Sequence, residues 1–272
     1  MKNKETAIRS IVNTAVEVFA NTFSNRHISQ VSNPDGVINS KRNNCFMSAL
    51  GEDFMIYSAL SRSFDSSLGS MLETIGRNIA RLSYRVLDDI DSILLPAQDQ
   101  YIRNLISSYD RRDEYPKVSH YDSFTAIIPK VTDSYRQVHK TDNFFCDDSS
   151  GTYYIIELKA GGDLDNKKAK SEKSEILREY FMLRNKIAMS SDKASNVKIF
   201  FATAYNRYGE GHEWKQERVL QYFSREELLI GRDYWNFICK SDKGFEIITD
   251  QYNKSAWKIR EAISNIKAAY HV

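Results

Sequence analysis

The segment from Thr141 to Lys159 reads TDNFFCDDSSGTYYIIELK, with two short apolar runs on either side of a polar turn. The first run follows Asp142, the turn covers Asp147–Gly151, and the second run ends in Glu157-Leu158-Lys159. Asp, Ser and Gly favour turns, so we expect two strands that pair as a hairpin. Because side chains alternate across a strand, Glu157 and Lys159 should share one face, with Leu158 turned into the core.

This hairpin brings together groups that can hydrolyse a phosphodiester. Alternation places the Glu157 carboxylate and the Lys159 ammonium about 7 Å apart along the strand, and Asp142 can complete the cluster from the neighbouring run. Mg²⁺ prefers oxygen ligands and keeps several waters, so two carboxylates and a substrate phosphate suffice to hold it. Lys159 would orient or deprotonate the attacking water. The alternative is that Glu157 and Lys159 form a solvated surface ion pair.

Composition limits the class of protein. The chain has 272 residues, 42% of them hydrophobic and 27% charged, which indicates one large domain or a core with an appendage. The net charge of +2 gives no global basic field, so a DNA-binding surface must be a local patch. Three widely spaced cysteines, Cys45, Cys146 and Cys239, fit neither a disulfide framework nor a zinc site. The chain also has no long apolar run and no signal-like N-terminus. Together with the cysteine pattern, these features predict a cytoplasmic protein without a membrane partner.

The first part of the chain is predicted to be mainly helical. A helix is expected over residues 3–23, a loop over 25–44, and a second helix from about Asp65. Weaker helical periodicity continues through Leu87, Ile90 and Leu94 to Pro96, and helix resumes over residues 101–109. Residues 1–110 are therefore expected to form a helical N-terminal part.

Residues 111–272 are predicted to form the catalytic core. Short apolar runs predict four strands, at Phe124–Ile128, Phe144–Cys146, Tyr153–Leu158 and Val197–Ala204. Amphipathic patterns predict a helix over residues 171–189 and a last helix over 255–269. A helix between two strands implies a crossover connection, so the fold class is α/β with a mixed, partly parallel central sheet flanked by helices.

A carboxylate inside the second helix forms another candidate. Around Glu73, the small residues Gly69, Gly76 and Ala80 share one helix face. Each glycine costs about 1 kcal/mol relative to alanine in a helix, so a close approach to the catalytic site or to a DNA backbone would explain them. A tight contact between the helix and the sheet is the alternative.

Two polar segments are candidates for binding DNA. Gly161-Gly162 is followed by lysines that could reach flanking phosphates, namely Lys167, Lys168, Lys170 and Lys173. The segment 203–218, TAYNRYGEGHEWKQER, includes Asn206 and Arg207, whose side chains can contact base edges. A solvated loop and a surface turn are the respective alternatives. The histidines lack zinc-ligand spacing, and there is no GxxxxGK[ST] phosphate loop.

Four blocks occur in an order that resembles type II restriction endonucleases of the TdeIII-like kind, within the PD-(D/E)xK nuclease superfamily. They are SLGSMLETIGRNIA, IELK, AYNRYGEG and LLIGRDYWNFI, scattered over roughly residues 60–240. The resemblance implies a restriction-endonuclease-like fold with a dimerising or DNA-embracing N-terminal part. It also implies a homodimer that uses Mg²⁺ to cut both strands of a short palindromic site, with or without an interruption. A cognate DNA methyltransferase would be its genetic rather than physical partner.

Carried over residue by residue, the resemblance assigns Asp142, Glu157 and Lys159 to the catalytic positions, with Glu73 as an accessory metal ligand. Lys140-Thr141 precede Asp142 where the pattern has Pro, so Asp147 or Asp148 is an alternative first carboxylate. We prefer Asp142, because Asp147 and Asp148 belong to the turn, at the far end of the hairpin from Glu157. The other functions considered are a structure-specific DNA repair or recombination nuclease and a non-catalytic DNA-binding protein.

Overall fold

The computed structural model describes residues 2–128, 133–190 and 196–270, without the side chains of Lys2, Asp133 and Asp142. These residues form two compact units. One unit combines the chain up to Ile79 with the chain from Phe245 onward, and the other runs from Ala80 to Gly244. The chain therefore returns to its first unit at the end, whereas the sequence suggested a single division near residue 110.

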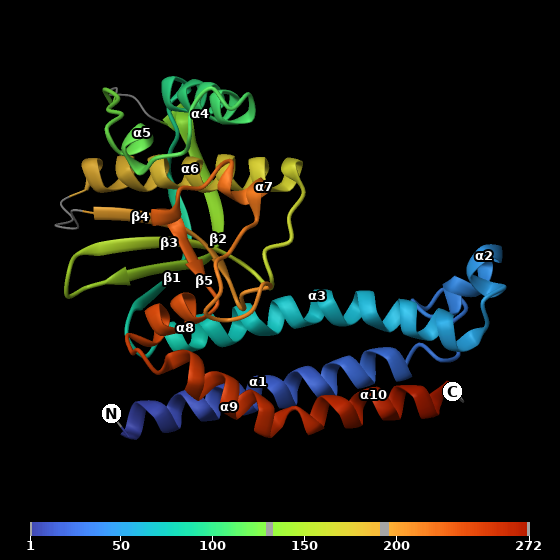
Figure 1. Ribbon diagram of the computed structural model, residues 1–272. Coiled ribbons are helices and arrows are strands. Elements are labelled where there is room, and N and C mark those ends of the chain that lie inside the picture. Colours follow the sequence, from blue (N-terminus) through green and yellow to red (C-terminus); the bar gives the residue numbers. More distant parts are fainter. Residues whose placement is uncertain (1, 129–132, 191–195, 271–272) are drawn as a thin grey trace. The chain divides into compact units, whose positions relative to one another are not determined.

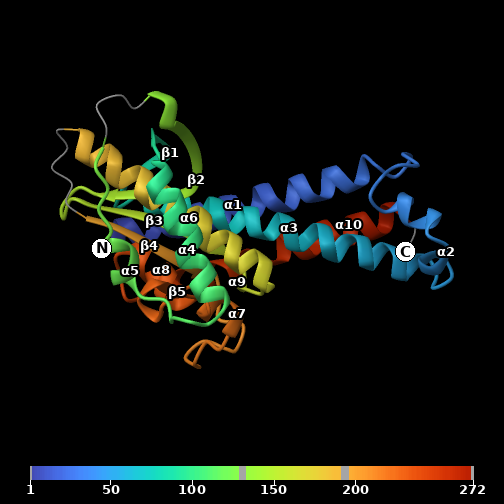
Figure 2. The ribbon, with the colours of Figure 1, turned by 90° about the horizontal axis from the view of Figure 1, so that it is seen from above.

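The first unit is helical. Buried apolar residues recur at helical spacing along α1, and the ring of Phe64 in α3 meets Phe19 and Phe23 edge-on at 5.5 and 5.8 Å. Lys258 of α10 forms an ion pair with Glu17 of α1 at 2.5 Å. Figure 1 and Figure 2 both show α1 beside α10. Its elements are α1 (Lys2–Ile28), η1 (Asn39–Asn43), α2 (Cys45–Ser48), α3 (Glu52–Ala80), α9 (Gly244–Ser255) and α10 (Trp257–Ala269).

The second unit contains a five-stranded mixed sheet in the order β1-β2-β3-β4-β5. The first three strands pair antiparallel, and β3, β4 and β5 pair parallel. The mixed α/β fold class is confirmed. The strands are β1 (Arg85–Ile93), β2 (Arg136–Asp147), β3 (Thr152–Lys159), β4 (Asn196–Thr203) and β5 (Leu228–Ile230). The helices are α4 (Pro96–Asp110), α5 (Val118–Asp122), η2 (Asp133–Tyr135), α6 (Asn166–Met189), α7 (Glu217–Leu220), η3 (Arg225–Glu227) and α8 (Arg232–Cys239).

Helix α6, which connects the parallel strands β3 and β4, covers one face of the sheet. Its buried residues Ile176 and Tyr180 join Tyr153 and Ile155 of β3 in one apolar core. Helix α4 packs on α6 from the other side (Figure 1). On the opposite face, Phe237 of α8 meets the rings of β3 and β4 at 5.0–5.7 Å. Strands β3 and β4 therefore have two buried faces over part of their length, as their largely apolar sequences require.

The helical prediction for residues 85–93 is wrong, because this segment forms β1 along β2. Its apolar residues Leu87, Ile90 and Ile93 are three positions apart, a spacing that fits a helix turn. The strand is irregular, with a register shift between Leu87 and Asp89, and this shift hides the twofold alternation. Pairing with β2 therefore decides the conformation rather than local periodicity.

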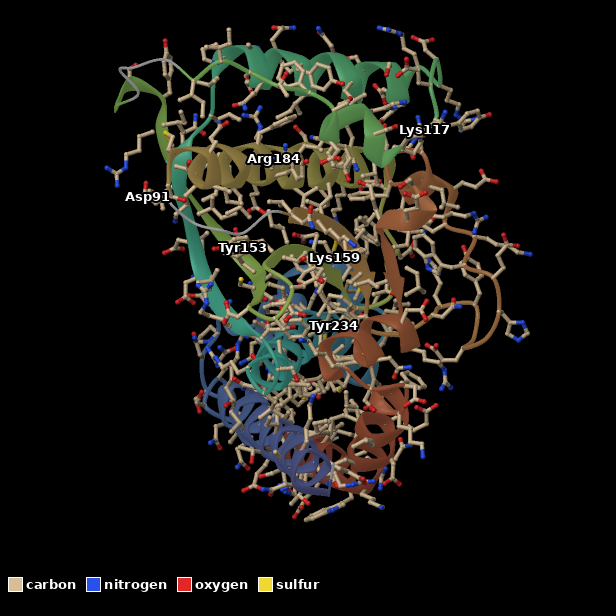
Figure 3. All side chains as sticks on the ribbon, turned by 90° about the vertical axis from the view of Figure 1, so that its left-hand side faces the viewer. Asp91, Lys117, Tyr153, Lys159, Arg184 and Tyr234 are labelled. Atoms are coloured by element: carbon tan, nitrogen blue, oxygen red, sulfur yellow. The ribbon has the colours of Figure 1, made fainter. Side chains whose placement is uncertain are left out.

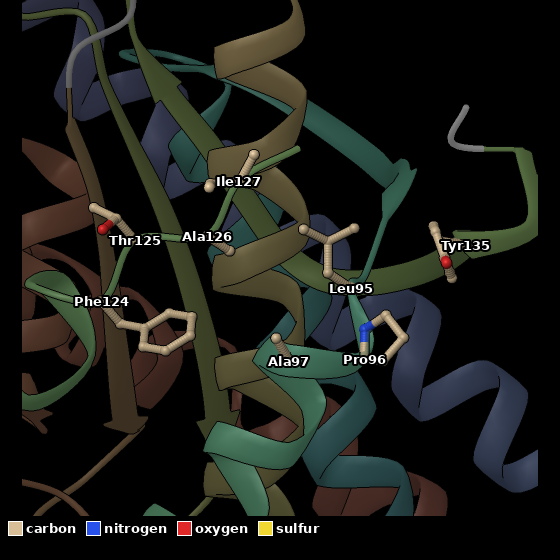
Figure 4. A pocket seen from close by; sticks show the side chains of 8 residues that line it. All are labelled: Leu95, Pro96, Ala97, Phe124, Thr125, Ala126, Ile127 and Tyr135. Carbon is tan, nitrogen blue, oxygen red and sulfur yellow. The ribbon is translucent and has the colours of Figure 1, made fainter. Parts of the chain in front are cut away.

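The strand predicted at Phe124–Ile128 is also absent, since these residues form coil. Phe124 packs against helices instead, with its ring 4.2 Å from Tyr101 of α4 and 5.6 Å from Phe181 of α6. Together with Leu95 and Ile127 it lines a hollow of about 430 Å³ at the start of α4 (Figure 4). The ring of Phe124 is therefore packed by α4 and α6 and not by a neighbouring strand.

Candidate active site

The predicted hairpin is formed by β2 and β3, which pair antiparallel with Phe144 opposite Ile155 and Asn143 opposite Ile156. Gly151, in the turn, has a φ of +62°, a conformation that glycine adopts without strain. Alternation along β3 directs Ile155 into the core beneath α6, and Leu158, on the other face, is buried. The predicted strand register around Leu158 is confirmed.

Lys159, at the end of β3, is the centre of a small charged cluster. Its Nζ lies 2.5 Å from Oε1 of Glu157 and 2.8 Å from Oε1 of Glu172 in α6. The three side chains are between 23% and 31% exposed, so the cluster is largely shielded but open to solvent on one side. Figure 3 shows Lys159 below α6, the helix that carries Arg184. Glu157 and Lys159 do meet on one face of β3, as the sequence predicted.

The electrostatics of this cluster favour a charged lysine. Burial alone would lower the pKa of Lys159, but the charges and hydrogen bonds of Glu157 and Glu172 outweigh it, and the pKa is raised. The side chain is therefore an ammonium at neutral pH. It can donate hydrogen bonds and balance negative charge.

Asp142 belongs by its backbone to β2, and its side chain lies outside what the structure describes. The ladder between β1 and β2 pairs Leu87 with Phe144 and Asp89 with Lys140. One residue of β1 therefore stands opposite three of β2, which is a β-bulge centred on Asp142. Bulges of this kind re-aim side chains and are over-represented beside active sites.

The alternative first carboxylates lie at the other end of the hairpin. Asp147 pairs with Thr152, the first residue of β3, and its carboxylate contacts Lys240 at 2.8 Å. Asp148 contacts Arg85 at 2.9 Å. These ion pairs hold the pKa of both carboxyls below the usual range. Both aspartates are thus engaged in ion pairs near the turn, at the opposite end of β3 from Glu157.

The donor set near Lys159 fits a hard divalent cation. The two carboxylate oxygens that contact Lys159 are at most 5.3 Å apart, because the contact distances of 2.5 and 2.8 Å add to that limit. Carboxylate oxygen is the ligand that Mg²⁺ prefers. Among the described side chains, which exclude that of Asp142, no group of three His, Cys, Asp or Glu residues is gathered around one point. A complete metal site there needs Asp142 or a substrate oxygen.

A further carboxylate on α6 contacts β2 at the bulge. Glu179 Oε1 accepts a hydrogen bond of 3.1 Å from Thr141 Oγ1, next to Asp142. Glu172 and Glu179 are seven residues apart, two helical turns along α6. Neither carboxylate was among the residues predicted from the sequence. A sequence signal for them exists. A helix that connects two parallel strands must run back along the sheet, so carboxylates seven positions apart on its inner side face the strands.

Glu73 lies in α3 of the first unit and is partly buried. A Cβ added at Gly69 would meet no described atom within 4 Å, so no contact within the described structure requires that glycine. The predicted approach of this helix face to the catalytic site or to a DNA backbone stays a prediction. An accessory role of Glu73 in metal binding stays a prediction.

The four lysines after Gly162 have different environments. Lys167 and Lys168 are exposed at the start of α6, and Lys170 pairs with Asp110 at 2.7 Å. Lys173 is fully buried and forms an ion pair with Glu227, so the prediction that it reaches a phosphate is wrong. The helix begins at Asn166 and places position 173 on the face that packs against the core.

The segment after β4 is a structured loop. The side-chain amide of Asn206 donates to the carbonyl oxygen of His212 at 2.7 Å, and its oxygen accepts from the Tyr208 N–H at 3.0 Å. Arg207 forms an ion pair of 2.5 Å with Asp163. Base contacts by Asn206 and Arg207 stay predictions, and such contacts would have to replace or extend these bonds.

Comparison with known proteins identifies the family of the chain. The model of a family described as "Type II restriction endonuclease, HinfI" matches residues 4–256, which is nearly the whole chain. The chain belongs to the HinfI family of type II restriction endonucleases. It is thus a site-specific deoxyribonuclease, a hydrolase whose substrate is DNA, and the resemblance to type II restriction endonucleases is confirmed.

The other comparisons add no relative to the HinfI family assignment. A search of curated proteins and a search of solved structures each found no match. Within the described segments, no helix combines the length and apolar character needed to cross a bilayer.

Proposed function

We propose that this member of the HinfI family hydrolyses both strands of a short palindromic DNA site with Mg²⁺, at the cluster of Asp142, Glu157 and Lys159. The observation that carries the proposal is the contact of Lys159 with Glu157 at the end of β3, next to the bulged strand that contains Asp142. An acid and an ammonium on one strand end, with a second acid on the adjacent strand, match the PD-(D/E)xK pattern.

Strand register supports Asp142 as the first carboxylate. The pairing of β2 with β3 ends with Asn143 opposite Ile156, and the same register continued by one step would bring Asp142 opposite Glu157. Cβ atoms of residues directly opposite in antiparallel strands are about 5 Å apart. Asp142 and Glu157 would hold the magnesium ion, which supplies charge neutralisation of the scissile phosphate and polarises a bound water.

Lys159 acts in this proposal as a hydrogen-bond donor and a positive charge. Its ion pairs with two carboxylates favour the ammonium form, which can orient an attacking water and balance the charge that develops on the phosphate. The sequence left open whether Lys159 orients or deprotonates the attacking water, and the ammonium form favours the first role. Proton abstraction from the water falls to another group or to solvent.

Cleavage of both strands favours a homodimer. The proposed cluster lies at the end of β3, so each protein chain supplies one cluster. A DNA duplex presents two strands that run in opposite directions. A two-fold dimer on a palindromic site places one cluster at each strand. We assign dimerisation or embracing of the DNA to the helical N-terminal part, and expect a methyltransferase as the genetic partner. The free cysteines suit a cytoplasmic location.

The first prediction concerns the two residues on β3. We expect Glu157→Ala or Lys159→Ala to reduce Mg²⁺-dependent cleavage of phage DNA by at least about 10³-fold, while specific binding in Ca²⁺ stays measurable. Gel-based cleavage and a mobility-shift assay measure the two properties. Glu175→Gln is the matched control, because Glu175 is on α6 with its side chain 56% exposed.

The parental protein should give discrete fragments with Mg²⁺ and none with EDTA. Light scattering should show two chains per specific duplex. Nicking that follows DNA structure instead of sequence would contradict site-specific cleavage. If either variant on β3 cuts at the parental rate, the site assignment fails.

A further inference from the structure

Glu172 enters the cluster from a different element than its partners. Glu157 and Lys159 are two residues apart on β3, whereas Glu172 is on α6, beyond the loop that follows Lys159. Its Oε1 lies 2.8 Å from Lys159 Nζ, and its side chain is only 24% exposed. An ion pair shielded to this degree is stronger than one on an open surface.

The neighbouring residue fixes the orientation of Glu172. Lys173 is completely buried, where its ammonium pairs with Glu227 and lies 4.9 Å from the ring of Tyr121 and 4.7 Å from that of Phe223. Asp165 caps the helix by accepting from the Lys168 N–H at 2.8 Å. Because these contacts fix the rotation of α6, Glu172 is directed at Lys159 before any substrate is bound.

The cluster makes two demands on Glu157. Its carboxylate contacts Lys159 in the structure, and under the proposed function it also binds the metal ion. A lysine held only by Glu157 would lose part of its anchor when that carboxylate turns to a cation. Glu172 supplies an anchor that does not depend on Glu157.

We propose that Glu172 is a positioning residue that holds the Lys159 ammonium in place while Glu157 binds the divalent cation. The inference rests on the proposed roles of Glu157 and Lys159. Glu172 acts through Lys159, so its removal should lower turnover more than substrate binding.

Steady-state cleavage of a short duplex with one site tests the role. We expect Glu172→Gln to lower kcat by about 10–100-fold with little change in KM, as for other residues that orient a functional group. Glu172→Asp, which keeps the charge on a shorter side chain, should recover part of the kcat. Glu175→Gln on the same helix should match the parental protein.

A metal-free measurement provides an independent readout. Lys159 should react slowly with acetic anhydride in the parental protein, because Glu157 and Glu172 both contact its Nζ. It should react severalfold faster in Glu172→Gln. Mass spectrometry of peptides measures the labelling, with exposed Lys167 as internal reference. If Glu172→Gln lowers the melting temperature strongly, Glu172→Asp is tested by the same kinetics and labelling.

Parental kcat and parental labelling of Lys159 in the Glu172 variants would overturn the positioning role. Failure of the proposed function gives a different result, because Lys159→Ala would then cleave at the parental rate. A loss of cleavage in Lys159→Ala together with unchanged Glu172 variants would overturn only the role of Glu172.

Discussion

Two adjacent residues of α6 have different roles, one in the buried core and one at the candidate active site. Lys173 points into the core and pairs with Glu227, which also accepts hydrogen bonds from Tyr121 at 2.8 Å and from the Ser224 hydroxyl at 2.9 Å. Glu172, one position earlier, points to Lys159. The sequence SEKSE shows the charges but does not reveal which of them is buried, since that depends on the rotation of the helix against the sheet.

The buried pair leads to a prediction about stability. We expect Lys173→Met to lower the free energy of unfolding by about 3–5 kcal/mol, because Glu227 would stay buried without its cation. The double variant Lys173→Met, Glu227→Gln should regain part of this stability, since the neutral amide leaves no buried charge and its single oxygen still accepts from Ser224. Urea denaturation measures both.

Lys170→Met is the control for the buried pair. Its ammonium contacts Asp110 at 2.7 Å with the side chain 41% exposed, so we expect a change below about 1 kcal/mol. A Lys173→Met protein as stable as the Lys170→Met protein would contradict the buried ion pair.

At the scale of elements, the pattern of apolar residues predicted most of the core. The long helices at both ends, the crossover helix α6, the hairpin and β4 follow the expected segments. The errors are β1, whose irregular pairing masks its alternation, and Phe124–Ile128, where Phe124 packs on helices. Both depend on partners distant in sequence, which local periodicity does not identify.

Two glycines, one in a loop and one in a helix, should respond oppositely to replacement by alanine. Gly162 has a φ of +68°, and a Cβ there would lie 2.7 Å from Cγ2 of Thr203. Gly69 is inside α3 with no described atom within 4 Å of an added Cβ. We expect Gly162→Ala to lower the free energy of unfolding by more than about 1 kcal/mol, and Gly69→Ala to raise it by about 1 kcal/mol.

Denaturation curves of the two glycine variants check this pair. A destabilised Gly69→Ala protein would show that the glycine is needed for a close contact, as the sequence analysis suggested. A Gly162→Ala protein as stable as the parent would contradict the loop geometry after β3.

For the molecule as a whole, the net charge of +2 means that attraction to DNA must come from local groups. The sequence identified Glu157, Lys159 and the hairpin, because strand alternation and turn chemistry act over a few residues. Local patterns did not identify Glu172, whose position follows only from the path of α6 along the sheet, or the return of the last helices to the first unit, because both depend on tertiary packing.

Lys167 and Lys168 provide the test of local charge. Replacing both by glutamine should weaken specific binding and reduce the slope of log K against log salt by about 1.8, since each phosphate that the protein no longer neutralises lowers the slope by about 0.9. Mobility-shift titrations over a range of NaCl concentrations measure the slope.

Lys198→Gln is the control for the two lysines. This exposed residue is five positions before Thr203, so it lies at the end of β4 opposite to the loop that follows the strand. Its slope should equal that of the parental protein. An unchanged slope in the Lys167, Lys168 double variant would show that these lysines do not contact the DNA.

The carboxylate of Glu210 joins the loop after β4 to the start of α8. Glu210 accepts from the Asn206 N–H at 2.8 Å and from the Arg232 N–H, at the start of α8, at 3.2 Å. The conformational entropy of this loop is therefore lost when the chain folds, not when the loop binds a ligand. Association through the loop should resemble rigid docking, without the large heat-capacity signature of a segment that orders on contact.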